Sequence, residues 1–388
     1  MKFDKKIIPY SKFSLLKEAT IDFQMNLPKE VLDISDIFKS NGYKLYVVGG
    51  AVRDSILKKT PKDYDVATDA TPEQIEKMID GKYKIIDGGK SKDLGVTIMI
   101  VNGEPFEVAT FREDIGKGRR PEGGVKYSTI ESDVKRRDLT MNALFYDIDK
   151  KEIVDLVGGI DDIMNGVVKT VGNANDRFEE DPLRKLRAIR FCGVTGSKVD
   201  KDVDEVLSRD NSLDGVSPER IRDEFKKTIL KAKSTIHVLN MIKKYKFFDK
   251  IFPGYKIYDN FKESNNWRLQ LGELLKLNEI EDFKHLVSSY KYEADESKYI
   301  IFYKEFINFK IDNVLNLSKL NVFFKFTPEE LRTIGEWNGM GPNLVEAFIK
   351  FKPTVTGDYI MSEFGLSGKD IKDKILELEI GNFKKLLL

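Results

Sequence analysis

A β-branched and aromatic run that ends in two glycines is the feature that most constrains this chain. Residues 44–48 read as a strand, Gly49 and Gly50 end it, and residues 51–57 have the pattern of a short helix. A strand that turns directly into a helix leaves backbone N–H groups free at the helix N-terminus, where they can hold a phosphate. Arg53 adds a fixed cation to this predicted cradle. Alone, such a glycine pair is more often an ordinary tight turn.

Two carboxylates, Asp63 and Asp65, follow on a segment that reads as a strand over 63–67. Residues i and i+2 of a strand project to the same face, so both carboxylates can converge while Tyr64 faces the other way. Their repulsion calls for a cation, and Mg²⁺ bridged by carboxylates and nucleotide phosphates is usual in phosphoryl transfer. A solvated Asp-x-Asp in a surface loop is the common alternative. Glu107, in a predicted neighbouring strand, is a candidate third catalytic carboxylate.

Composition excludes several other kinds of chemistry. The chain has 65 Lys and Arg against 64 Asp and Glu, so nucleic-acid binding must rest on local basic patches. A single cysteine, Cys192, excludes an internal disulfide and a Cys-rich zinc site, and the two histidines lie far apart. No apolar run is long enough for a membrane span or a signal peptide. We therefore expect a cytoplasmic protein that uses carboxylates, arginines and backbone amides.

Hydrophobic patterning divides the chain into a sheet-containing first part and a helical remainder. Residues 82–86, 95–101 and 105–111 read as strands of a mixed or antiparallel sheet. After residue 161 the pattern is helical, with few strand signals. The expected fold class is α+β.

Two arginine-rich segments complete the candidate residues. The first, 136–144, offers both phosphate and hydroxyl partners through Arg136, Arg137, Asp138 and Asn142. The second carries a charged stripe at every third residue of a predicted helix, formed by Asp181, Arg184, Arg187 and Arg190. Without context, the first would more often be a surface salt-bridge cluster and the second an ordinary amphipathic helix.

The order and spacing of these pieces resemble the head of class II tRNA nucleotidyltransferases and their poly(A) polymerase relatives, within the polymerase-beta-like nucleotidyltransferase superfamily. The resemblance implies that Asp63 and Asp65 hold Mg²⁺ and that Gly50 and Arg53 grip phosphates. It also implies that Arg137 contacts the nucleotide. By the same resemblance, Asp138 and Asn142 touch the ribose. The residues that line the base pocket are Asp181, Arg184, Arg187 and Arg190.

By the same resemblance, Asp181 and Arg184 form an amino-acid template for the incoming base. A carboxylate only accepts hydrogen bonds and a guanidinium only donates them, so the pair asks for an amino donor beside a ring-nitrogen acceptor. Cytosine and adenine have that edge. Uracil and guanine reverse it and would leave buried polar groups unpaired, at about 1 to 3 kcal/mol each.

The resemblance covers residues 40–230 strongly and the last 60 or so more faintly. It implies a nucleotidyltransferase sheet domain over 1–158 followed by an all-α neck with the base-template helix (159–240), body (241–326) and tail that binds tRNA (327–388). The polar segment 112–129 resembles the family's mobile loop, in which Arg119, Arg120 and Lys126 are candidate guides for RNA or triphosphate. The segment 217–230 resembles the family's neck helix, whose charges would pin the template helix by ion pairs.

The sequence therefore predicts a Mg²⁺-dependent enzyme that adds or repairs the 3′-terminal CCA of tRNA from CTP and ATP. Its RNA partner would be the tRNA acceptor arm, with no membrane association and no obligate protein partner. Two alternatives stay open. One is an A-only adding enzyme or poly(A) polymerase of the same family, and the other is a non-catalytic RNA-binding protein.

Overall fold

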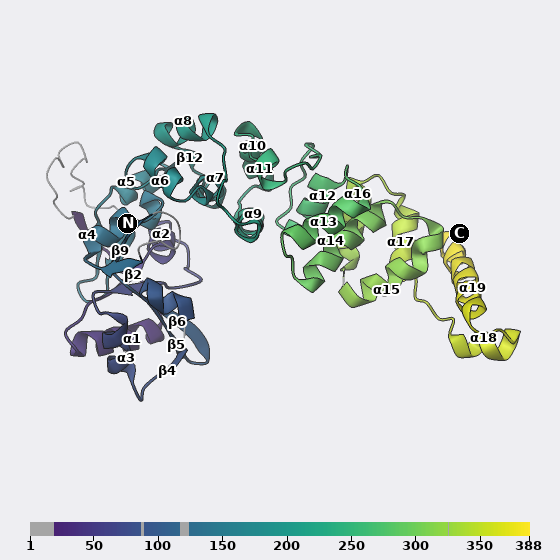
Figure 1. Ribbon diagram of the computed structural model, residues 1–388, viewed down its shortest axis with the longest axis horizontal. Helices are drawn as coiled ribbons and strands as arrows, with labels where there is room; N and C mark the ends of the chain where they lie inside the picture. Colours follow the sequence, from purple (N-terminus) through teal and green to yellow (C-terminus); the bar gives the residue numbers. More distant parts are fainter. Residues whose placement is uncertain (1–18, 87–88, 117–123, 325) are drawn as a thin grey trace. The chain divides into compact units, whose positions relative to one another are not determined.

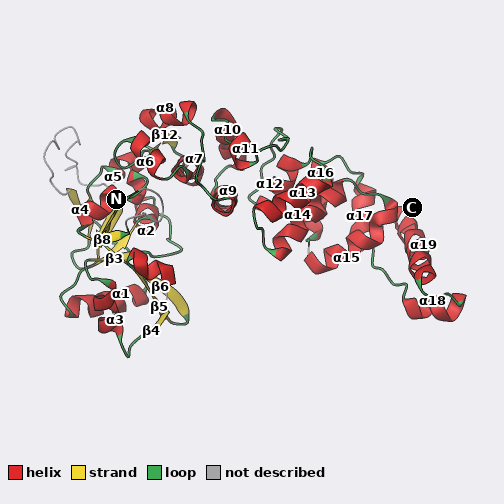
Figure 2. Cartoon of the chain, viewed as in Figure 1, coloured by secondary structure: helices red, strands yellow, loops and turns green. Residues whose placement is uncertain are grey.

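The computed structural model describes residues 19–86, 89–116, 124–324 and 326–388. Two compact units make up the chain, Met1–Val216 and Ser217–Leu388. Every strand of the described residues lies in the first unit and the second is helical, which confirms the α+β class (Figure 2). The finer division into head, neck, body and tail stays a prediction.

An eight-stranded mixed sheet forms the centre of the first unit (Figure 1). Its strand order is β1-β10-β9-β2-β3-β6-β5-β4, and among these described strands β3 and β6 form the parallel pair. The strands are β1 (Ala19–Asp22), β2 (Leu45–Val48), β3 (Val66–Thr68), β4 (Lys84–Ile86), β5 (Val96–Val101), β6 (Glu104–Thr110), β9 (Leu144–Asp147) and β10 (Glu152–Asp155). The predicted strand over 63–67 begins too early, because Asp63 to Asp65 form an irregular segment that leads into β3.

Helices cover the sheet where the apolar side chains require it. Helices α1 (Lys29–Ser40) and α3 (Pro72–Ile79) lie side by side and contact β2 and β5 respectively (Figure 1). Thr71 caps α3 in a capping box with Gln74, and Pro72 begins the helix. Helix α2 (Gly50–Ile56) contacts β2 and β9.

The rest of the first unit consists of short elements around the later candidate residues. These elements are η2 (Gly89–Leu94), β7 (Arg112–Asp114), β8 (Val125–Tyr127), α4 (Ile130–Lys135), η3 (Thr140–Asn142), α5 (Gly159–Met164), β11 (Val167–Val168), α6 (Ala174–Glu180), α7 (Leu183–Thr195), β12 (Lys198–Val199) and α8 (Lys201–Arg209). Strand β7 pairs with β8, and β11 pairs with β12. Gly159 lets α5 pack tightly on η3, because a Cβ there would lie 2.3 Å from the carbonyl oxygen of Thr140.

The second unit is built from helices around an aromatic core that includes Phe302, Phe306, Phe348 and Phe383. The Thr327 side chain caps α16 (Pro328–Trp337) in a capping box with Glu330. The helices are α9 (Pro218–Lys231), α10 (Thr235–Lys244), α11 (Phe248–Ile251), α12 (Trp267–Leu275), α13 (Ile280–Ser289), α14 (Ala294–Ile307), η4 (Ile311–Asn313), α15 (Val314–Phe324), α16 (Pro328–Trp337), α17 (Pro342–Lys350), α18 (Gly357–Phe364) and α19 (Lys369–Leu387).

Candidate active site

The glycine turn joins β2 to α2 as the sequence predicts. Gly49 has φ 69° and ψ −120°, a conformation that residues with side chains rarely adopt. Its N–H donates to the carbonyl oxygen of Leu144, which ties the turn to β9. No side chain caps α2, so the first amides of the helix are available to an anion.

The acidic pair lies directly beside this turn, because the Val48 N–H donates to the carbonyl oxygen of Asp65 at 2.9 Å. Asp63 and Asp65 are exposed, and neither carboxylate forms an ion pair or hydrogen bond with another residue of the described chain. The pKa of Asp65 is raised, first because the surrounding protein displaces part of its hydration and second because Asp63 repels its charge, while Arg137 opposes both. The Tyr64 hydroxyl donates to the Asn26 carbonyl oxygen at 3.0 Å.

Glu107 lies on the strand next to this pair. Val66 of β3 is in register with Val108 of β6, so one residue earlier the same parallel register sets Asp65 beside Glu107. Its side chain is exposed, as a catalytic carboxylate requires. The described residues contain no cluster of three or more His, Cys, Asp or Glu side chains arranged to hold a metal ion. Two uncompensated carboxylates do fit a hard divalent cation that takes its other oxygens from phosphates and water.

Arg137 lies between the glycine turn and a buried carboxylate that sequence reasoning missed. Its Nε and Nη2 donate to Oδ2 of Asp133 at 3.1 and 2.9 Å, and its guanidinium stacks 4.7 Å from the ring centre of Phe145. Asp133 also accepts from Arg136 and is 1% exposed. Burial alone would raise the pKa of Asp133, but the two guanidinium groups outweigh it and lower the pKa. Asp133 therefore fixes where Arg137 points.

The Arg53 side chain is buried, and its guanidinium is hydrogen-bonded to protein groups instead of facing an open phosphate site. Its guanidinium donates to the carboxylate of Asp54 and, through Nη1, to Oδ1 of Asn142. This contact orients the amide of Asn142, whose buried Nδ2 has no partner among the described residues. An unpaired buried donor at this point is what a ligand acceptor would satisfy. The predicted phosphate contact of Arg53 and ribose contact of Asn142 stay predictions.

Asp138 connects the same region to α7. Its Oδ2 accepts from Nε and Nη2 of Arg187 at 2.7 and 2.6 Å, and its Oδ1 accepts from the Leu139 N–H. Burial alone would raise the pKa of Asp138, but Arg187 outweighs it and holds the pKa below its usual value. Phe191 was also missed from sequence, although three guanidinium groups lie 4.3 to 5.7 Å from its ring centre, those of Arg53, Arg187 and Arg190.

The predicted base-reading pair lies at the junction of α6 and α7. Asp181 follows α6 and precedes α7, so it is not part of a continuous helical stripe with Arg184 as the spacing suggested. Its Oδ1 accepts from the Leu183 N–H. Arg184 pairs with Glu180 at 2.7 Å and donates to two backbone carbonyls, so it is held in place by groups other than Asp181.

The remaining predicted residues lie outside this cluster. Arg119 and Arg120 fall outside the described residues, and Lys126 is exposed on β8. In the predicted neck helix, Glu219 pairs with Lys291, and Arg222 donates to carbonyls at 290 and 291, all within the second unit.

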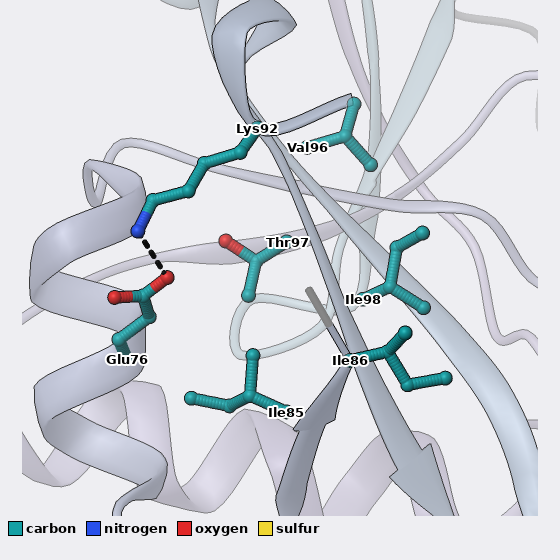
Figure 3. A pocket seen from close by; sticks show the side chains of 7 residues that line it. All are labelled: Glu76, Ile85, Ile86, Lys92, Val96, Thr97 and Ile98. Atoms are coloured by element: carbon teal, nitrogen blue, oxygen red, sulfur yellow. Dashed lines mark ion pairs between the residues drawn. The ribbon is translucent and has the colours of Figure 1, made fainter. Parts of the chain in front are cut away.

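A separate cavity of about 400 Å³ lies at the β4 edge of the sheet, where β4 is the third strand beyond β3 (Figure 3). The cavity is lined by the ion pair between Glu76 and Lys92 and by apolar side chains of β4 and β5. None of the predicted site residues in the described chain lines it. We therefore place the candidate active site at the glycine turn and the acidic pair rather than here.

Two known family models match parts of this chain. Residues 45–169 match the family described as "Poly A polymerase head domain", and residues 208–258 match "Probable RNA and SrmB- binding site of polymerase A". Residues 45–169 therefore belong to the class of poly(A) polymerase-type head domains. No described helix is both long and apolar enough to cross a membrane.

Named relatives narrow the class. A CCA-adding enzyme of Ligilactobacillus salivarius is 34% identical over 293 residues, which are 71% of this chain and 70% of the relative. One of Bacillus subtilis is 38% identical over 229 residues (58% and 56%), and poly(A) polymerase I of Haemophilus influenzae is 29% identical over 276 (68% and 58%). The chain belongs to the class II CCA-adding enzyme family. The match spans a little over half the length of the latter two relatives.

Solved structures share the fold across almost the whole chain. The CCA-adding enzyme of Bacillus stearothermophilus in complex with CTP aligns with a TM-score of 0.66 at 22% identity, covering 92% of this chain and 93% of the other. The Thermotoga maritima CCA-adding enzyme complexed with tRNA aligns with a TM-score of 0.61 at 19% identity, covering 93% and 95%.

Proposed function

We propose that this protein transfers nucleoside monophosphates from CTP and ATP to the 3′-hydroxyl of tRNA, and so builds or repairs the CCA end in the cytoplasm. The observation that carries the proposal is the exposed, uncompensated pair Asp63 and Asp65 beside the Gly49 turn. CCA-adding enzymes among the relatives support the choice of substrate.

Asp63 and Asp65 would hold Mg²⁺, with Glu107 next to Asp65 across the β3–β6 register as a third carboxylate. When bound, the cation supplies charge neutralisation at the phosphates and lowers the pKa of the attacking hydroxyl. The protein contributes the position of Asp65, because its backbone carbonyl accepts from the Val48 N–H beside the glycine turn.

Nucleotide positioning would fall to groups with remaining hydrogen-bonding capacity. The amides of Gly50 and the next residues of α2 face no side-chain cap and suit phosphate oxygens. Arg137, held by Asp133, supplies a cation at the same turn. The free Nδ2 of Asn142 is a donor for a ribose hydroxyl or a carbonyl of the base.

Base choice would rest on Asp181 and Arg184. Of the five N–H groups of Arg184, three are used by Glu180 and by the carbonyls of Arg177 and Arg136. Two remain for a base edge, and the Asp181 carboxylate, whose Oδ1 accepts from the Leu183 N–H, would supply the acceptor beside them. Cytosine and adenine match that pair of partners. Residues 327–388 would bind tRNA as a tail.

Incubation with tRNA lacking its 3′ end, Mg²⁺ and each labelled nucleoside triphosphate tests the proposal. Successive incorporation of C, C and A is expected. Extension with ATP alone would instead assign poly(A) polymerase or A-only activity, which the Haemophilus influenzae relative keeps open. Retention of tRNA with no incorporation of any nucleotide would reject the enzymatic proposal.

A further inference from the structure

A second cavity of about 500 Å³ lies beside the acidic pair, and no predicted site residue lines it. Its walls are the segment 23–28, between β1 and α1, and residues of 55–64, from the last turn of α2 to the segment before β3. Tyr64, which separates Asp63 from Asp65, forms part of the wall and is fixed there by its hydrogen bond to the Asn26 carbonyl. The cavity therefore includes the side chain of the residue that lies between the two carboxylates in the chain.

The polar side of this cavity suits a phosphate. Lys58 and Lys59 are exposed at its edge, and neither ammonium group forms an ion pair or hydrogen bond within the described part of the chain. Lys58 has φ 57°, and the backbone N–H groups of both lysines donate to carbonyls at the end of α2, so the turn presents them in a defined conformation. Among the described residues, no acidic side chain lines the cavity.

The other side suits a base or a ribose. Phe23, Pro61 and Tyr64 are half-buried and offer aromatic and ring surfaces, and Ser55 adds a hydroxyl without a described hydrogen-bond partner. Cations beside flat apolar surfaces are the combination with which proteins bind single-stranded nucleic acid independently of sequence.

We propose that this cavity binds a nucleotide of the RNA strand just upstream of the reacting 3′ end. This inference rests on the proposed function. The incoming nucleotide would lie at the N-terminal end of α2, at Gly50, whereas the cavity lies at its C-terminal end, at Ser55 and Lys58. A helix of seven residues separates these ends by about 10 Å. One strand can therefore reach the cavity while its 3′-hydroxyl lies at the acidic pair.

The double variant Lys58→Gln/Lys59→Gln tests this assignment against Lys62→Gln. Lys62 is exposed in the same loop but does not line the cavity, so Lys62→Gln is the matched control. We expect the KM for tRNA lacking its 3′ end to rise about tenfold in the double variant, with the KM for CTP and kcat unchanged. Wild-type kinetics in the double variant, or a rise in the KM for CTP instead, would overturn the inference.

A binding measurement separates this inference from the proposed function. Fluorescence anisotropy with a labelled single-stranded RNA oligonucleotide reports on the cavity even if the protein adds no nucleotide. If the wild-type protein adds no nucleotide but the double variant binds the oligonucleotide more weakly than Lys62→Gln does, the proposed function is rejected and the RNA-binding cavity is kept. If the wild-type protein is fully active and both variants bind the oligonucleotide equally well, the proposed function is kept and the RNA-binding cavity is rejected.

Discussion

The candidate site has an acidic half, Asp63 and Asp65, and a basic half, Arg137, Arg184 and Arg187, and the two differ in whether their charges are already paired. Asp63 and Asp65 are exposed and unpaired within the described residues. The arginines are neutralised before any ligand arrives, with Arg137 on Asp133, Arg184 on Glu180 and Arg187 on Asp138. The acids thus keep their charge available for the proposed cation, whereas the arginines are oriented by the protein.

This difference separates the free energy of folding from the free energy available for binding. The charged form of Asp65 destabilises the fold, because partial loss of hydration and then repulsion from Asp63 raise its pKa. Buried ion pairs instead become costly when one partner is lost, because the other charge stays buried alone. Substitutions on the acidic side should therefore abolish activity and spare stability, and those on the basic side should affect both.

Asp65→Ala should give the largest effect on activity. We expect incorporation to fall by about 10³-fold or more, because a metal ion contributes several kcal/mol to such transition states. RNA binding should persist, and the free energy of unfolding should stay equal or rise, since the repulsion from Asp63 is removed. Single-turnover incorporation and urea unfolding measure the two quantities.

Glu104→Ala, an exposed carboxylate on β6, is the control for this substitution. Its activity should match the wild type. Substantial incorporation by Asp65→Ala, or loss of its RNA binding, would contradict the role given to this carboxylate.

Asp133→Asn should show the opposite behaviour. Removing a carboxylate that is 1% exposed and paired with two arginines should lower the free energy of unfolding by about 3 kcal/mol. It should also raise the KM for CTP, since Arg137 loses its orientation. Urea unfolding followed by circular dichroism measures the first effect, and steady-state kinetics the second.

The exposed pair Lys39–Asp149 supplies the comparison for Asp133. Asp149→Asn should change the free energy of unfolding by less than about 0.5 kcal/mol. An equal and small loss in both variants would mean that the Asp133 pairs contribute little to the fold.

These two halves also differ in how far the sequence predicted them. The glycine turn and the acidic pair lie close together in the chain, so their spacing carries the information. Asp133 and Glu180 lie four residues before Arg137 and Arg184 respectively. This helical spacing is typical of ion pairs, so the sequence does contain a local signal for both contacts. The contact of Arg187 with Asp138 joins residues 49 apart, and no local pattern encodes that distance.

Long-range packing likewise explains what was missed in the fold. Strands β1, β9 and β10 continue the sheet through antiparallel pairing with each other and with β2. Their pairing partners are set by the whole sheet rather than by their own apolar pattern. The start of β3 at Val66 has the same cause, because the ladder with β6 begins there.

Glu180→Gln should loosen base selection without loss of the fold. The variant keeps a hydrogen-bond acceptor for Arg184 but removes its charge, so the guanidinium is less firmly oriented. We expect the preference for CTP over UTP, as a ratio of kcat/KM values, to fall about tenfold. Glu205→Gln, which removes an exposed ion pair on α8, should leave the ratio unchanged. An unchanged ratio in Glu180→Gln would mean that Arg184 needs no support from Glu180.

The smallest expected effect is the pH dependence of the free energy of unfolding that the Asp138–Arg187 pair contributes. The pKa of Asp138 is lowered in the folded protein, so the unfolded chain binds more protons in acid. Its contribution to stability is complete above the unfolded pKa of about 3.9 and is lost as the pH falls through the lower folded pKa. Asp138→Asn should therefore be less stable at neutral pH but lose less further stability on acidification. Urea midpoints measured between about pH 6 and about pH 3 test this, and parallel curves for variant and wild type would show that the Arg187 pair contributes no pH-dependent stability.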